Sequence, residues 1–310
     1  MRVSEAFCPA GISSFFEVCN VDSSGTPLTN PARIGARGGG FAIPRGATSR
    51  AIVRKSAETT IKIKINSKPA PEAHTTRSAI EQLLKTQGIT LDVAIDLKVA
   101  CPIAAGFGTS AAGTLASCLA VSDAADIPVT LNELGRITHV ADVVNHTGLG
   151  TAAALLTGGF VLVTEPGAPG IGLVDRLLFP EKHSIICAYI GPIPTSETLV
   201  KADVGMSVNA SAKRTMDAVR QNSTLSTFLA ESRKFGRETG FETTTVTRLI
   251  SIMVSSGATG AAQNMIGEAV HGVASDRKVG RIMQSVKKAF PAAKVFAVPI
   301  DNRGVRLLGN

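Results

Sequence analysis

Two short segments in the first third of the chain alternate strictly between apolar and polar residues. Residues 60–66 read TIKIKIN, and residues 91–100 repeat the pattern in LDVAIDLKVA. A period of two is typical of a β-strand with one buried face. Between them, residues 74–88 carry apolar positions at helical spacing and end on a glycine, a common helix C-terminus. The pattern predicts a strand, a helix and a second strand.

Small residues dominate the segment that follows the second strand. Residues 98–123 read KVACPIAAGFGTSAAGTLASCLAVSD, which predicts a glycine turn followed by a helix rich in alanine. A further helix is expected over 130–146, where Thr130 and Glu133 have the spacing of a capping box. Residues 158–165 then return to a strand pattern.

The chain changes character after a Pro- and Gly-rich exit at about residues 165–172, which is the expected domain boundary. The predicted division is 1–168 and 169–310. This alternation of elements predicts an α+β fold with two lobes. In the second lobe we expect a buried strand at 183–191, helices around 197–221, 224–236, 242–255 and 259–274, a strand at 293–301 and a final hairpin over 301–309.

Composition supports a folded chain, and its positive charge balance is compatible with an anionic substrate or with no specific partner. Of the 310 residues, 44% are hydrophobic and 18% are charged, with a formal net charge of +8. The chain has no Trp and one Tyr, whereas a nucleic-acid surface interleaves basic residues with stacking aromatics. We therefore expect no nucleic-acid partner.

Nothing in the sequence indicates a membrane or an oxidising compartment. The longest apolar stretch, residues 149–163, is too short and too rich in Gly and Thr to span a bilayer. The five cysteines show no C-x-x-C spacing, which favours free thiols in a reducing cytosol. The expected location is cytoplasmic.

The glycine turn at residues 102–113, PIAAGFGTSAAG, is the main candidate for chemistry. A helix N-terminus leaves N–H groups unpaired, and glycines before it let the backbone approach an anion. Thr109 or Ser110 adds a hydroxyl able to contact a phosphate or its magnesium. Glycine spacing alone leaves a tight turn equally open. The lysine of a Walker A loop is missing, and so is the dinucleotide fingerprint.

The full text of this loop resembles the P-x-x-x-G-L-G-S-S-A-A phosphate loop of the GHMP kinase superfamily. CPAGISSFFEV near the N-terminus and HVADVVNHTGLG downstream agree in order and spacing. Within the superfamily the chain is most similar to the archaeal pantoate kinase family, which carries segments like GARGGGFAI and GGFVLVTEPGAPG. The resemblance covers residues 5–170 well, and GPIPTSETL with the C-terminal half more loosely. It implies a first lobe like domain 2 of ribosomal protein S5 and a helix-rich α+β second lobe.

The resemblance also implies an ATP and Mg²⁺ site. Ser110 and Asp142 would ligate the metal and serve as the catalytic pair. A solvated helix carboxylate is the alternative for Asp142. The phosphates of ATP would be held by Pro102, Gly106, Phe107, Gly108, Thr109, Ser110 and Ala111.

Four residues are expected near the acceptor substrate: Arg37, Ser13, His146 and Thr151. Arg37 suits a carboxylate because its guanidinium donates in a planar fork, although a surface arginine is the alternative. Thr151 stands where many superfamily kinases have a basic aspartate. His146 is a conceivable substitute base or an ordinary helix-end residue. Ala10 and Gly11 replace the Gly-His usual in pantoate kinases, which leaves Ser13 and Ser14 as nearby hydroxyls or as plain turn or strand residues.

The implied activity is ATP-dependent phosphorylation of the hydroxyl of (R)-pantoate to 4-phosphopantoate on the route to coenzyme A. One alternative is a GHMP kinase for another small alcohol, such as homoserine or a mevalonate-like acid. The other is a degenerate kinase that only binds a nucleotide or metabolite. Related kinases suggest a possible homodimer. The superfamily's third glycine-rich motif is not evident. Residues 255–269 are the nearest candidate, but they resemble a helix entry and receive no catalytic role.

Overall fold

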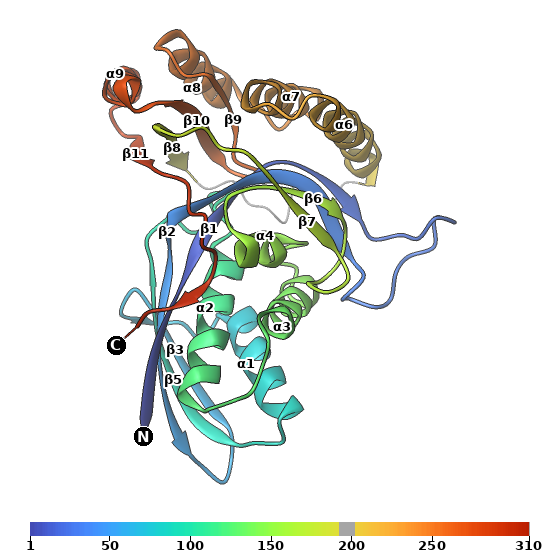
Figure 1. The fold of residues 1–310 in the computed structure, drawn as a ribbon, viewed down its shortest axis with the longest axis vertical. Coiled ribbons are helices and arrows are strands. Elements are labelled where there is room, and N and C mark those ends of the chain that lie inside the picture. Colours follow the sequence, from blue (N-terminus) through green and yellow to red (C-terminus); the bar gives the residue numbers. More distant parts are fainter. Residues whose placement is uncertain (192–201, 310) are drawn as a thin grey trace.

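A computed structural model describes residues 1–191 and 202–309. The chain forms two sheets, one of eight strands and one of four, each with helices of its own (Figure 1). The predicted two-lobed α+β fold of the GHMP kinases is confirmed.

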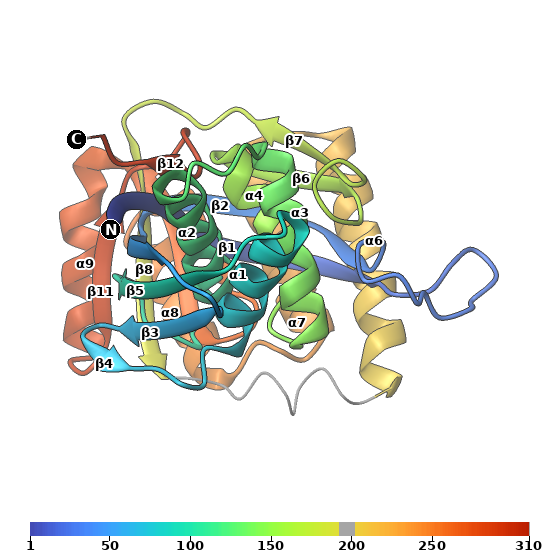
Figure 2. The ribbon, with the colours of Figure 1, turned by 90° about the horizontal axis from the view of Figure 1, so that it is seen from below.

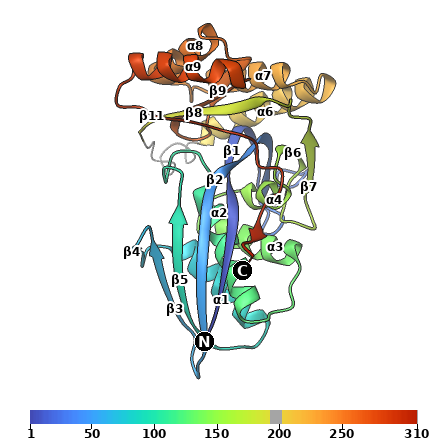
Figure 3. The same cartoon turned by 60° about the vertical axis from the view of Figure 1, so that its left-hand side comes forward.

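Two long strands at the N-terminus form the spine of the larger sheet. β1 (Arg2–Cys19) and β2 (Gly35–Lys55) pair antiparallel along almost their whole length and run from the N-terminus up to the second lobe (Figure 3). The strand order is β12-β1-β2-β5-β3-β4, and β6 joins β2 and β7. The remaining strands of this sheet are β3 (Thr60–Ile65), β4 (Lys68–Pro69), β5 (Leu91–Val99), β6 (Phe160–Glu165), β7 (Leu173–Leu177) and β12 (Arg306–Leu307).

Four helices gather on one side of this sheet (Figures 1 and 2). They are α1 (His74–Thr86), α2 (Thr109–Ala124), α3 (Leu131–Val144) and α4 (Thr151–Thr157). α2 lies against β1 and β2 and between the other helices, so most of its residues are buried. Its many Ala, Gly and Ser residues are small enough to permit this close packing. The capping box of Thr130 and Glu133 begins α3 as predicted.

The second lobe is a four-stranded antiparallel sheet in the order β11-β8-β10-β9. Its strands are β8 (His183–Gly191), β9 (Gly260–Gln263), β10 (Glu268–Ser275) and β11 (Lys294–Val298). The helices α6 (Ala202–Gln221), α7 (Leu225–Glu238), α8 (Thr244–Ser255) and α9 (Asp276–Ala289) belong to this lobe. Phenylalanines join the lobes: Phe228 of α7 packs edge-on against Phe160 with ring centroids 4.6 Å apart.

The predicted helix over 259–274 is wrong, because this stretch forms β9, a tight loop and β10. Residues 269–274 of β10 are buried on both faces of the strand. A strand without an exposed face shows no alternation, so its apolar run cannot be told from a buried helix. The helix α9 that follows was not predicted, and neither were β1 and β2. Residues 197–201 of the predicted helix 197–221 and all but Gly191 of GPIPTSETL lie outside the described residues.

The predicted C-terminal hairpin is also wrong. Residues 306–307 pair antiparallel with Ala6 and Phe7 of β1. Asp301 organises the preceding turn, since its carboxylate accepts hydrogen bonds from the backbone N–H groups of Arg303 and Gly304 and from the Arg306 guanidinium. The last strand therefore returns to the first sheet, as β7 also does. The division at residue 168 stays a prediction.

In the part of the chain that the structure describes, no helix is long and apolar enough to cross a membrane. The five cysteines are free thiols, and all except Cys19 are buried.

Candidate active site

The N-terminus of α2 begins on a turn that only glycine adopts readily. Gly106 and Gly108 have φ values of +74° and +57°, and Gly108 is the residue that caps α2. Gly108 has no side chain to occupy the N–H groups of the first turn, and that turn carries no acidic residue. Thr109 is the first helical residue and Ala111 is buried, while Pro102 is half-buried where the chain enters the loop. The turn therefore presents free N–H donors, as an anion site requires.

Phe107 fixes this turn between the two lobes. Its side chain is 1% exposed and packs on Phe296 of β11 with ring centroids 5.9 Å apart. Its carbonyl accepts a hydrogen bond from the N–H of Gly11 at 3.0 Å. The loop is thus held by the buried Phe107 side chain and by β1.

Thr151 lies against the same turn. A Cβ atom on Gly108 would come within 2.7 Å of its Cγ2, and one on Gly11 within 3.1 Å. The structure therefore brings Thr151, which the resemblance aligns with a basic aspartate, next to the predicted phosphate loop. A threonine hydroxyl has no accessible ionisation near neutral pH, so Thr151 can donate or accept a hydrogen bond there but cannot serve as a general base.

Ser110 and Asp142, 32 residues apart in sequence, meet beside the turn. The Ser110 hydroxyl donates to Oδ1 of Asp142 at 3.0 Å, and the Thr147 hydroxyl donates to the same oxygen at 2.6 Å. Asp142 is 2% exposed. Burial raises the pKa of Asp142 to about 6, against the opposing effect of these two hydrogen bonds. The carboxylate is mostly ionised at neutral pH, and none of the described residues forms an ion pair with it.

This pair fits a magnesium ion that also binds phosphate. Mg²⁺ usually takes one or two carboxylates from the protein and completes its octahedron with water and phosphate oxygens. Among residues 1–191 and 202–309, no group of three or more His, Cys, Asp or Glu residues could hold a metal without such help. One buried carboxylate with an adjacent hydroxyl, at the N-terminus of a helix, provides the donor set expected for the metal of a nucleotide.

Arg37, which is predicted to bind the acceptor carboxylate, already has a partner. Its Nε and Nη2 atoms donate to the two carboxylate oxygens of Glu17 at 2.9 and 2.8 Å, and this pairing raises the pKa of Arg37. The neighbouring Ala36 contacts Gly150, because a Cβ on that glycine would lie 3.5 Å from the Ala36 carbonyl oxygen. A substrate carboxylate at Arg37 would have to share the guanidinium with Glu17.

The other two candidates are His146 and Ser13, and no side-chain contact among the described residues distinguishes either of them. His146 is exposed at the C-terminal end of α3 with φ +55°, where its backbone N–H donates to Val143. Ser13 is half-buried in β1, and its carbonyl accepts a hydrogen bond from the N–H of Met265 at 2.8 Å. Their roles toward the acceptor stay predictions.

Sequence reasoning missed two contributors to this region. Thr147, in the NHTGLGT segment, binds the Asp142 carboxylate. The β9–β10 loop, residues 264–267, covers the phosphate loop: a Cβ on Gly267 would lie 2.7 Å from the carbonyl carbon of Ala105. The signal for this loop was the glycine-bearing AAQNMIG segment, whose assignment to a helix hid its position.

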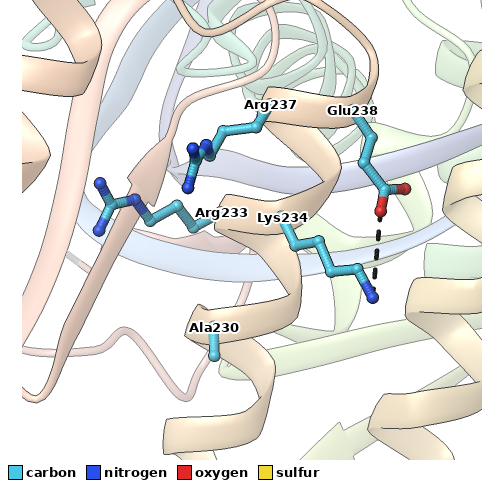
Figure 4. Close-up of a pocket in the computed structure, with 5 residues that line it drawn as sticks. All are labelled: Ala230, Arg233, Lys234, Arg237 and Glu238. Atoms are coloured by element: carbon cyan, nitrogen blue, oxygen red, sulfur yellow. Dashed lines mark ion pairs between the residues drawn. The ribbon is translucent and has the colours of Figure 1, made fainter.

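A separate hollow of about 480 Å³ lies on α7 (Figure 4). Arg233 and Arg237 extend to one side of the helix, and Lys234 extends to the other side with Glu238, to which it is ion-paired. Its lining includes none of the predicted site residues.

This chain is similar in sequence and in fold to known proteins. Residues 74–159 match the N-terminal domain of the GHMP kinases. The chain is 27% identical to the pantoate kinase of Methanospirillum hungatei over 312 residues, which covers 98% of this chain and 96% of that protein. It is 28% identical to the pantoate kinase of Thermococcus kodakarensis over 76% of this chain and 75% of that protein. A solved structure described as a phosphotransferase related to the CoA biosynthesis pathway superposes with a TM-score of 0.87, at 21% identity and 98% coverage of both chains.

The matched domain spans α1 to α4 and so includes the α2 turn, Ser110 and Asp142. Residues 74–159 are therefore similar to a GHMP kinase N-terminal domain, and the chain has the fold of the GHMP kinases.

Proposed function

We propose that this chain transfers the γ-phosphoryl group of ATP to the hydroxyl of (R)-pantoate and so forms 4-phosphopantoate for coenzyme A synthesis. The contact that carries the proposal is the 3.0 Å hydrogen bond between Ser110 and the buried Asp142, beside the glycine turn that begins α2. Similarity to two named pantoate kinases supports the choice of acceptor.

In this proposal the α2 turn binds the phosphates of ATP. Backbone N–H groups from Gly106 to Ser110 donate to phosphate oxygens, and the positive end of the α2 dipole favours their negative charge. These donors are fixed before the nucleotide arrives, because Phe107 is locked in the interlobe core. Fixed donors stabilise charge in the transition state without reorganising.

Ser110 and Asp142 would hold the magnesium ion of the nucleotide. When bound, the metal neutralises negative charge on the transferring phosphoryl group. Thr147 holds the carboxylate of Asp142 toward the site through the 2.6 Å hydrogen bond. Ser110 would exchange its present hydrogen bond to Asp142 for a metal contact.

The acceptor hydroxyl would be activated by position alone. Phosphoryl transfer passes through a loose transition state and depends chiefly on alignment and charge neutralisation. Thr151, which touches the phosphate turn at Gly108, would orient the acceptor hydroxyl, whose proton would pass to a phosphoryl oxygen or to water as the new P–O bond forms and the bond to ADP breaks. Arg37, shared with Glu17, is the proposed partner of the acceptor carboxylate.

The proposal is tested by measuring ADP release with ATP, magnesium and (R)-pantoate, with phosphorylation of pantoate confirmed by mass spectrometry. Release that depends on pantoate and is lost in Ser110→Ala supports it. Release that depends on another hydroxy acid but not on pantoate contradicts the acceptor assignment.

A further inference from the structure

A chain of three buried polar side chains crosses from the larger sheet to the smaller one. The Ser14 hydroxyl on β1 lies 2.9 Å from Nε2 of His271 on β10. Nδ1 of His271 lies 2.9 Å from Oδ1 of Asn264, in the β9–β10 loop. All three residues are 0% exposed. We call this set the Ser14–His271–Asn264 chain.

The polarity of this chain is fixed by the imidazole. Complete burial lowers the pKa of His271 to about 3, so the ring is neutral at physiological pH and has one N–H donor and one acceptor nitrogen. Asn264 Oδ1 then accepts from Nδ1–H, and Nε2 accepts from the Ser14 hydroxyl. The remaining amide nitrogen, Nδ2 of Asn264, is buried and has no hydrogen-bond partner within the described residues.

Asn264 stands directly against the phosphate turn. A Cβ on Gly106 would lie 3.0 Å from both Cβ and the carbonyl oxygen of Asn264. The backbone on either side of Asn264 is held as well, since its N–H donates to Ala269 and the next N–H, of Met265, donates to Ser13. The α2 turn, which belongs to the first lobe, therefore packs against a segment of the second lobe. The Asn264 side chain of that segment is linked through His271 to Ser14 on β1 of the first lobe.

Keeping a buried donor unpaired is unfavourable for folding alone. A residue that served only to fill the space beside Gly106 would not need a polar side chain, a histidine partner and a serine at the far end. The arrangement suits a segment whose conformation must be set accurately beside a ligand site.

We propose that Asn264 is a positioning residue for the phosphate turn, held in place by His271 and Ser14, so that nucleotide binding depends on the contact between the two sheets. This inference rests on the proposed use of the α2 turn to bind ATP. It gives the β9–β10 loop a role in the nucleotide site that the sequence did not indicate.

The test compares MgATP binding by calorimetry in three variants of the chain and in one matched control. His271→Phe keeps an aromatic ring beside Phe41, whose centroid is 5.5 Å away, but removes both hydrogen bonds. We expect its dissociation constant for MgATP to rise about tenfold, while the KM for pantoate changes less than twofold. His271→Gln carries one amide donor and one acceptor, and we expect it to stay within threefold of the parent protein. Asn264→Ala should match His271→Phe.

Ser49→Ala is the matched control. It also removes a buried hydroxyl hydrogen bond, the 3.0 Å contact with Ser117 in the core of the first lobe, away from Asn264. We expect its thermal midpoint to fall without a change in MgATP affinity. Should His271→Phe fold poorly, Ser14→Ala tests the far end of the chain and is expected to weaken MgATP binding about threefold.

Three outcomes overturn the inference. It fails if His271→Phe and Asn264→Ala bind MgATP like the parent protein, or if they lose MgATP and pantoate equally in step with their thermal midpoints. If the parent protein itself binds no MgATP, the proposed function falls and this inference falls with it. Parent binding with unaffected variants refutes the inference alone.

Discussion

The carboxyl group of Asp142 lies in a nearly water-free environment between the hydroxyls of Ser110 and Thr147. Desolvation raises its pKa to about 6, and a cation is the partner that would offset the cost of its charge. Ser110 is the residue placed to share that cation. The metal chemistry of the proposed site therefore depends on two side chains.

Replacing either side chain should remove most of the activity. We expect Ser110→Ala and Asp142→Ala to lower kcat about 100-fold or more, because charge on the transferring phosphoryl group is no longer neutralised at the right place. Steady-state ADP release over a magnesium titration measures this. Ser122→Ala is the control on the same helix, since its hydroxyl only donates to the Cys118 carbonyl. Full activity in both variants would show that the metal site is misassigned.

The buried His271 should make the protein less stable at acid pH. Its folded-state pKa of about 3 lies below the value near 6.5 of an exposed histidine. Below pH 6.5 the unfolded chain therefore binds a proton that the folded chain excludes, and stability is lost as the pH falls from 6.5 toward 3. Relative to His271→Gln, the parent protein should lose about 1.4 kcal/mol of unfolding free energy per pH unit in this window.

Urea unfolding of both proteins between pH 4 and pH 7 checks this expectation. Other groups that titrate in this range are common to the two proteins, so the difference between them isolates His271. Parallel pH dependences would show that His271 is protonated in the folded protein.

At the scale of elements, the turn before α2 is set by glycine geometry and crowding together. Gly108 combines a left-handed φ with Thr151 Cγ2 only 2.7 Å from the position of a Cβ. Either feature alone is tolerable at some cost. Together they mean that a side chain at position 108 could be accommodated only if the loop or α4 moved.

Gly108→Ala should therefore weaken MgATP binding by more than tenfold. Gly88→Ala is a matched control, because Gly88 has φ +63° but no atom within 4 Å of a built Cβ. We expect this control to lose about 1 kcal/mol of stability through backbone strain and to keep its MgATP affinity. Equal nucleotide binding in the two variants would mean that the turn does not contact ATP.

Some of these elements could be predicted from the sequence and others could not, for physical reasons. The strand over 60–65 and the capped helix α3 each have an exposed face, so periodicity and capping revealed them. β10 is buried on both faces and was assigned to a helix. The pairing of Ser110 and Asp142 could be predicted because both residues lie in segments that resemble GHMP kinase motifs. The contact of Asn264 with Gly106 could not, because it depends on a loop from another lobe. No local pattern encodes such a contact.

At the scale of the whole molecule, the C-terminal strand β12 forms one edge of the first sheet. β12 pairs with β1, and the Asp301–Arg306 ion pair fixes the turn that leads into it. Asp301 is almost fully buried, and the Arg306 guanidinium also lies 4.5 Å above the ring of Phe7. The end of the chain is thus built into the lobe that holds the phosphate turn.

Arg306→Ala should lower the free energy of unfolding by about 3 kcal/mol, because it leaves the buried Asp301 carboxylate without its cation. Arg50→Ala, which breaks the exposed ion pair with Glu5, should cost less than about 1 kcal/mol. Chemical denaturation of both variants gives the comparison. Equal effects would show that β12 contributes little to the stability of the sheet.

The most direct test of the account is ADP release by the whole protein with ATP, magnesium and each of (R)-pantoate, homoserine and mevalonate, with Ser110→Ala in parallel. The account predicts magnesium-dependent release with pantoate that Ser110→Ala abolishes, and little release with the other two. Release with homoserine or mevalonate but not pantoate would contradict the proposed acceptor. Nucleotide binding without release in any mixture would contradict catalysis itself and leave a binding protein on a kinase fold.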